Sequence, residues 1–162
     1  MWFFFIAVAV VIIVFIYKAM NSNSAFLSIV NSVPNLKGAR IFRAVGDSFI
    51  AINKNGYIGI KASMTEKTLV FHVRDLIEFD ARKNSKASGG LLSSFFNSKS
   101  PEKVSSLSIV FTINSFDNHL IELEFMDIGG TTDSMIFKSA LKRLEEVWTL
   151  IELLQKNLLK DK

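Results

Sequence analysis

The first seventeen residues of the chain contain no charged side chain and no Gly, Pro, Ser or Asn. A helix that crosses a bilayer needs about 20 mostly apolar residues, and residues 1–20 reach that length with Lys18 as the one interruption. Trp2 and Tyr17 stand at the two ends of this run, where interfacial aromatic side chains are expected. Lys18 follows directly and can extend its ammonium group to the lipid headgroups. We therefore predict a transmembrane anchor over residues 1–20 that is held by Trp2, Tyr17 and Lys18.

A cleaved secretory signal peptide is the other interpretation of this apolar run. Signal peptides begin with a basic region and end at a cleavage site with two small residues. Here no Lys or Arg precedes the run, and Ser22 and Ser24 are the nearest small residues behind it. A retained anchor is therefore the favoured prediction.

The orientation of a membrane helix follows from the basic residues near its ends, because cytoplasmic flanks carry an excess of Lys and Arg. Lys18, Lys37, Arg40 and Arg43 follow the apolar run, and none precedes it. This pattern predicts that the rest of the chain lies on the cytoplasmic side. The sequence contains no Cys, which agrees with a reducing compartment without excluding another.

Beyond the anchor, we predict a linker over residues 21–38 and one domain over residues 39–160. The linker contains a short amphipathic helix over residues 25–33, which Ser24 can cap and which Pro34 ends. The chain beyond the anchor, about 140 residues, is long enough for one domain with its own core.

Apolar residues that alternate with a period of two predict seven strands, over residues 41–45, 48–53, 57–61, 68–73, 76–81, 106–114 and 119–126. The segment 53–56, Asn-Lys-Asn-Gly, predicts a tight turn, because Asn and Gly tolerate positive φ. In the fifth strand, Leu76, Glu78 and Asp80 are expected on one face.

A helix is predicted over residues 134–159, with Asp133 or Thr132 as its cap. Its apolar stripe has spacings of three and four and consists of Phe137, Ala140, Leu144, Val147, Ile151, Leu154 and Leu158. Packing of this stripe on the sheet is favoured over a coiled coil, since the run covers only about three heptads. A run of antiparallel strands closed by one helix indicates an α+β or small-barrel fold.

This order of elements resembles a pleckstrin-homology-type domain, in which seven antiparallel strands form two nearly orthogonal sheets and a C-terminal helix plugs one end. Residues 69–80, Leu-Val-Phe-His-Val-Arg-Asp-Leu-Ile-Glu-Phe-Asp, resemble bacterial variants of that domain. The chain is also similar to small bacterial proteins that join such a domain to one N-terminal membrane helix. The resemblance covers residues 40–160 and implies a binding role at a bacterial inner membrane. The resemblance implies no catalytic residue. It does not imply phosphoinositide binding either, because Lys54 and Lys61 correspond only loosely to the paired basic residues that such binding requires.

The segment 82–104 is predicted to be a flexible loop, because it is rich in small and polar residues around an apolar patch. Apolar side chains with basic neighbours suit an anionic membrane surface. The candidate residues for contact with a membrane or a partner are Arg82, Lys83, Lys86, Leu91, Leu92, Phe95, Phe96, Lys99 and Lys103. In the alternative interpretation, the four apolar residues tuck under the sheet and close the core.

Residues suited to catalysis or metal binding are few. His72 and His119 are the only histidines, whereas a zinc site needs three or four closely spaced ligands. Glu122 and Glu124 share one face of a predicted strand, as expected of a solvated surface. No nucleophile elbow and no phosphate-binding glycine loop occurs in the sequence. We therefore expect no enzymatic activity, no cofactor and no metal.

The net charge of +4 is unevenly distributed along the chain. Residues 1–62 hold six basic groups and one acidic group, whereas residues 105–162 hold six and nine. Anionic lipids attract basic groups near a cytoplasmic leaflet, whereas the scattered charge does not suit nucleic acid. We expect a binding or scaffolding module that meets the lipid bilayer, through anionic lipid or another membrane protein. The alternative function is a prophage-type exclusion or immunity protein that acts at the inner membrane.

Overall fold

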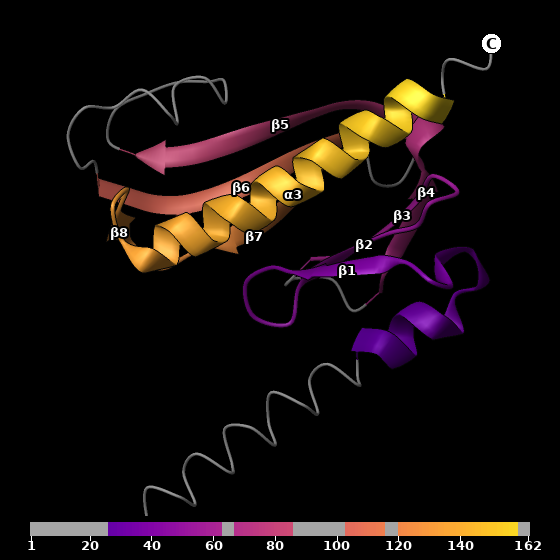
Figure 1. The fold of residues 1–162 in the computed structure, drawn as a ribbon, viewed down its shortest axis with the longest axis horizontal. Coiled ribbons are helices and arrows are strands. Elements are labelled where there is room, and N and C mark those ends of the chain that lie inside the picture. Colours follow the sequence, from indigo (N-terminus) through magenta and orange to yellow (C-terminus); the bar gives the residue numbers. More distant parts are fainter. Residues whose placement is uncertain (1–25, 63–66, 86–102, 116–119, 159–162) are drawn as a thin grey trace, which may run out of the picture.

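The computed structural model describes residues 26–62, 67–85, 103–115 and 120–158. Two antiparallel sheets and a long C-terminal helix make up most of this part of the chain (Figure 1). The α+β class, the antiparallel sheets and the closing helix are therefore confirmed. The predicted anchor, with Trp2, Tyr17 and Lys18, lies outside the described residues. Among the described residues, no helix is both long enough and apolar enough to span a bilayer.

The first sheet has four strands in sequence order, β1 (Arg40–Arg43), β2 (Phe49–Ile52), β3 (Tyr57–Lys61) and β4 (Leu69–His72). The predicted turn between β2 and β3 is confirmed. The backbone N–H of Asn55 donates to the side-chain oxygen of Asn53 at 2.6 Å, and Gly56 has a φ of 89°. The side-chain amide of Asn53 also donates to the carbonyl of Lys37 at 2.7 Å. The turn is thus tied to the segment before β1.

The second sheet contains β5 (Leu76–Ser85), β6 (Lys103–Ile113) and β7 (Leu120–Met126), and the short β8 (Gly130–Thr131) pairs with the start of β6. An irregularity in the β5–β6 register between Leu76 and Glu78 shifts the alternation of β5. Leu76 and Ala81 are consequently both buried, while Ile77 is 58% exposed. The prediction that Leu76 shares a face with Glu78 and Asp80 is wrong, because a bulge adds one residue to the strand.

Backbone hydrogen bonds join the two sheets at two corners. The N–H of Val45, in the β1–β2 turn, donates to the carbonyl of Glu124 in β7 at 2.8 Å. At the other corner, η2 (Val73–Asp75) connects β4 to β5. There Val73 donates to the carbonyl of Gly56, and Asn114 donates to that of Asp75, both at 2.7 Å.

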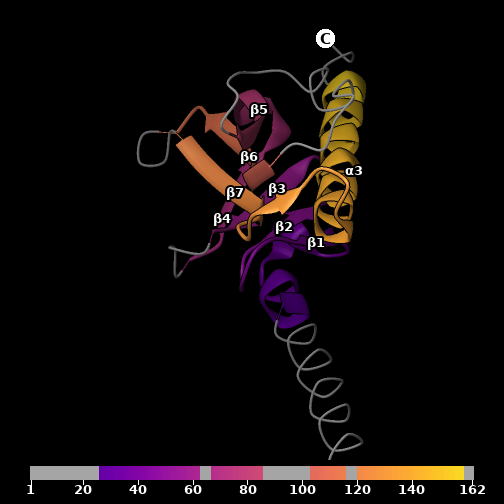
Figure 2. The ribbon, with the colours of Figure 1, turned by 90° about the vertical axis from the view of Figure 1, so that its left-hand side faces the viewer.

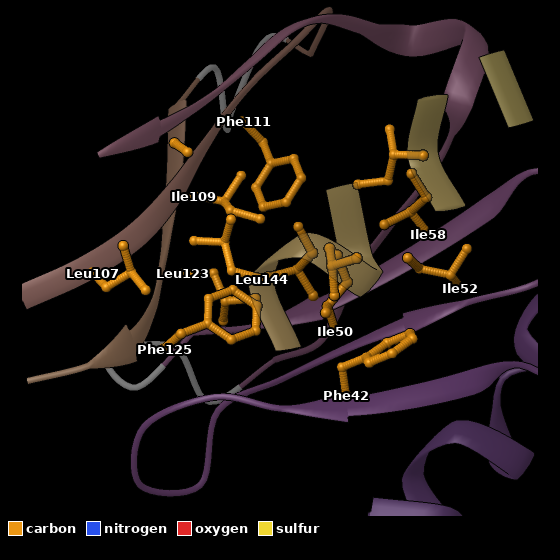
Figure 3. Close-up of a cluster of buried hydrophobic side chains, with 14 of the residues drawn as sticks. Phe42, Ile50, Ile52, Ile58, Leu107, Ile109, Phe111, Leu123, Phe125 and Leu144 are labelled. Carbon is orange, nitrogen blue, oxygen red and sulfur yellow. The ribbon is translucent and has the colours of Figure 1, made fainter. Parts of the chain in front are cut away.

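Helix α3 (Met135–Leu158) covers the inner faces of both sheets. The first five residues of the predicted stripe are buried, namely Phe137, Ala140, Leu144, Val147 and Ile151. Figure 3 shows Leu144 among side chains from both sheets, including Ile50, Ile109 and Phe125. The predicted orientation of the helix is confirmed.

The residue that caps α3 is Ser134. The backbone N–H of Phe137 donates to the Ser134 hydroxyl oxygen at 3.2 Å, as an N-cap side chain requires. The side chain of Asp133 instead accepts a hydrogen bond from the Thr131 hydroxyl. The prediction of Asp133 or Thr132 as the cap is therefore wrong by one or two residues.

A second, smaller apolar cluster lies on the outer side of the first sheet. Residues 26–32 are helical, as the predicted amphipathic helix implies, and η1 (Pro34–Leu36) follows directly. Phe26, Val30 and Leu36 pack on Phe49 and Ala51, and the rings of Phe26 and Phe49 meet edge to face at 5.3 Å. Residues 26–36 therefore pack as part of the folded domain, which extends beyond the predicted boundary at residue 39.

Gly59 is the residue that allows this outer cluster to form. A Cβ atom at Gly59 would lie 2.4 Å from Cδ1 of Leu36, and Leu36 is fully buried and cannot move aside freely. We expect Gly59→Ala to lower the free energy of unfolding by about 1–3 kcal/mol, the usual cost of overpacking. Urea denaturation of a chain that begins at Ser24 measures this change.

Gly129→Ala is the matched control for this prediction. A Cβ atom there would meet only the carbonyl oxygen of Val104, at 3.7 Å, which is an ordinary contact. We expect a change within about 0.5 kcal/mol, as at most surface positions. Equal losses of stability for the two variants would contradict the role given to Gly59.

Candidate functional site

Three of the predicted contact residues lie in strands. Arg82 and Lys83 belong to β5, opposite Ser108 and Leu107 of β6, and Lys103 is the first residue of β6, opposite Thr131 of β8. The predicted loop of residues 82–104 is thus shorter than expected, because backbone pairing extends β5 to Ser85 and starts β6 at Lys103. Strand alternation directs neighbouring side chains to opposite faces of a sheet, so Arg82 and Lys83 do not form one basic face.

The other predicted contact residues lie outside the described residues. They are Lys86, Leu91, Leu92, Phe95, Phe96 and Lys99. Their contact with a membrane or a partner remains a prediction, as does their alternative role in closing the core.

The chain segments around β8 present large apolar side chains to solvent. Ile128 precedes β8 and is 66% exposed, and Met135 and Ile136 begin α3 and are 85% and 57% exposed. Figure 2 looks onto this end of the molecule, where β8 lies beside the first turn of α3. The sequence pattern did not predict these residues as an exposed group. One feature of the sequence could have indicated their exposure. Met135 and Ile136 precede Phe137, the first residue of the apolar stripe, and so lie outside the face that packs on the sheets.

Basic residues are found in the same segments and in the strand ends that pair with them. We define the basic end as residues 82–84, 103–104 and 127–142. The first range lies at the end of β5 and the second at the start of β6. The third contains β8 and the first two turns of α3. Its basic residues Lys83, Lys103, Lys138 and Lys142 outnumber its acidic residues, Asp127 and Asp133. Arg82 adds a further positive charge, but the strand register places it in one row with Glu124 on the outer face of the second sheet. The Thr131 hydroxyl donates a hydrogen bond that lowers the pKa of Asp133 below its ordinary value. The basic end therefore combines a net positive charge with exposed apolar side chains.

The opposite electrostatic character is found on the outer face of the second sheet. The β5–β6–β7 register aligns Asp80 with Val110 and Glu122, and Arg82 with Ser108 and Glu124. Glu122 and Glu124 are exposed, and the hydroxyl of the buried Ser108 donates to Glu122 at 2.6 Å. Residues 26–32 lie on the other side of the molecule, against the outer side of the first sheet (Figure 2). The acidic face is thus directed away from residues 26–32.

The titratable groups in the described segments offer little for catalysis or metal binding. In these segments, no group of three or more His, Cys, Asp or Glu side chains is placed to hold a metal ion. Both ring nitrogens of His72 are engaged, since Arg74 N–H donates to Nδ1 and Nε2 lies 3.1 Å from the carbonyl oxygen of Asn55. The prediction that His72 is a hydrogen-bonded structural residue is confirmed, whereas His119 lies outside the described residues.

Comparison of the chain with models of protein families, with curated proteins and with solved structures found no match. The α+β fold, the basic end and the acidic sheet face are therefore the features from which a function is inferred.

An ion pair joins the β1–β2 turn to the end of β3. The Lys61 ammonium contacts the carboxylate of Asp47, and this hydrogen bond, together with the positive charge of Lys61, lowers the pKa of Asp47 below its ordinary value of 3.8. A carboxyl group whose pKa is lower in the folded state stabilises the fold above its unfolded pKa. This contribution is lost as the pH falls from about 4 through the folded-state pKa.

We expect Lys61→Met to raise the pKa of Asp47 toward its ordinary value, because both the hydrogen bond and the charge are removed. Titration of the carboxyl carbons by NMR measures this shift. Asp133 is the internal control, since its pKa depends chiefly on Thr131 and is expected to stay unchanged. An unchanged pKa of Asp47 would show that Lys61 is not the cause.

The geometry around His72 also makes a prediction about its tautomer. Because the backbone of Arg74 is a donor and that of Asn55 is an acceptor, the neutral ring carries its proton on Nε2. Nitrogen chemical shifts of the neutral ring are expected to show this tautomer. A ring protonated on Nδ1 would mean that the hydrogen bond from Arg74 does not form.

Proposed function

We propose that the protein is a membrane-anchored binding or scaffolding module, without enzymatic activity, at the cytoplasmic face of a bacterial inner membrane. Its domain is proposed to be pleckstrin-homology-like. The strand orders β1-β2-β3-β4 and β5-β6-β7, followed by the long helix α3, support this assignment. The resemblance implies seven antiparallel strands in two sheets before a C-terminal helix, and β8 is an addition to these.

The observation that carries the proposal is the meeting of positive charge and exposed apolar side chains at the basic end. Scattered apolar residues are common on protein surfaces, whereas gathered ones mark interaction sites. Ile128, Met135 and Ile136 are each more than half exposed and lie within the same end as Lys103 and Lys138. A binding role explains this surface, and the exposed carboxylates of the second sheet give no sign of catalysis.

The packing of the first described residues supports the anchoring part of the proposal. Phe26 is buried against the first sheet, and only residues 21–25 separate it from the predicted anchor. The domain of an anchored chain is thereby held a few residues from the bilayer. The Arg43 guanidinium lies over the ring of Phe26 at 5.1 Å, which adds a basic group on this side.

The absence of Cys from the sequence allows a clean test of the topology. In the full-length chain, Glu122→Cys places one thiol on the exposed face of β7. We expect the chain to stay in the membrane fraction after a carbonate wash. A membrane-impermeant maleimide is expected to label the thiol in permeabilised bacteria and not in intact ones.

The unsubstituted chain is the control for labelling, and the Glu122→Cys chain in detergent is the control for reactivity of the thiol. Labelling in intact cells would place the domain on the periplasmic side and overturn the proposed location. Recovery of the chain in the soluble fraction would overturn the anchor.

A further inference from the structure

The basic end carries an apolar tip that the core does not use. In α3 the buried stripe starts at Phe137, so Met135 and Ile136 stand before it and are 85% and 57% exposed. Ile128 reaches the same end from the turn before β8 and is 66% exposed. None of the three side chains belongs to either buried cluster. They therefore gain little stabilisation from burial when the chain folds.

Lysines stand behind this tip along the helix. Met135, Lys138 and Lys142 are spaced by three and four residues, which places them on one face of α3, and all three are exposed. A rise of 1.5 Å per residue puts Lys138 about 4.5 Å and Lys142 about 10 Å behind Met135 along the helix axis. Lys103, opposite Thr131 in the β6–β8 pair, adds a third ammonium at the same end.

We propose that the basic end inserts Ile128, Met135 and Ile136 among the headgroups of an anionic bilayer, with Lys103, Lys138 and Lys142 against the lipid phosphates. Apolar side chains at a tip with lysines behind them match the layering of a membrane surface, where acyl chains lie below charged headgroups. This inference rests on the proposed function, because the anchor supplies the bilayer.

Charge and size favour lipid over a protein occupant. In a two-fold dimer through this end, Lys103 and Lys138 of one copy would approach lysines of the other copy, and like charges repel. Three apolar side chains are also few for a stable protein interface, which takes about 20–30 residues a side. A tethered domain needs only a weak contact, since the tether raises the effective concentration of the surface.

The test uses the full-length chain in vesicles of phosphatidylcholine and phosphatidylglycerol. Met135→Cys carries an environment-sensitive fluorophore at the tip, and Leu153→Cys carries it on the same helix at an exposed position far from the tip. We expect a quencher attached to the lipids to reduce the fluorescence at position 135 severalfold more than at position 153. The difference is expected to shrink in vesicles of phosphatidylcholine alone.

Charge reversal tests the lysines independently of the labelled position. With the fluorophore at position 135, Lys138→Glu together with Lys142→Glu is expected to reduce quenching in the anionic vesicles. Lys156→Glu, near the other end of α3, is the matched control and is expected to leave it unchanged. All three lysines are exposed, so the fold is expected to persist, and circular dichroism checks this.

The outcomes separate this inference from the proposed function. Loss of the chain from the vesicles after a carbonate wash would overturn both. Retention with equal quenching at positions 135 and 153 would overturn the inference and leave the anchor intact. A spectral shift at position 135 that appears in both kinds of vesicle and grows with the ratio of protein to lipid would identify a second copy as the occupant, which also overturns the inference.

Discussion

The burial of two sheet faces under one helix is the interaction on which the rest of the structure depends. Helix α3 contacts β1 of the first sheet and β6 and β7 of the second. Its Leu144, Val147 and Ile151 are fully buried, together with Ile58 of β3 and Phe111 of β6. Each sheet alone would leave an apolar face in water. This shared core holds the two sheets and α3 together. It thereby also fixes the positions of the basic end and the acidic face.

The parts of the fold that local patterns determine could be predicted from the sequence. Strand β3 has the bounds expected for it, residues 57–61, and α3 differs from the predicted helix by one residue at each end. These elements have a regular apolar period, and side-chain period is a property of the chain itself. The turn at residues 53–56 could also be predicted from local sequence, because Asn and Gly tolerate the positive φ values that tight turns require.

The features that could not be predicted depend on residues distant in the sequence. The bulge at Ile77 reflects the pairing of β5 with β6, and the packing of Leu36 depends on the space that Gly59 leaves. Arg82 and Lys83 were predicted as contact residues because of their charge, whereas their separation onto two faces depends on the extension of β5 to Ser85 by pairing with β6. The extent to which Met135 is exposed could not be predicted, because exposure at a helix start is set by the tertiary structure rather than by local spacing.

The packing of residues 26–36 on the first sheet has a consequence for stability. Phe26 is buried against β2, and Leu36 packs against Gly59 of β3. A hydrogen bond from the Asn53 side chain to the Lys37 carbonyl fixes the end of this segment. Residues 26–36 therefore belong to the first sheet as a packed layer rather than as a separate linker. Loss of this layer would expose Phe49 and Ala51 of β2 to water, so residues 26–36 and the first sheet stabilise each other.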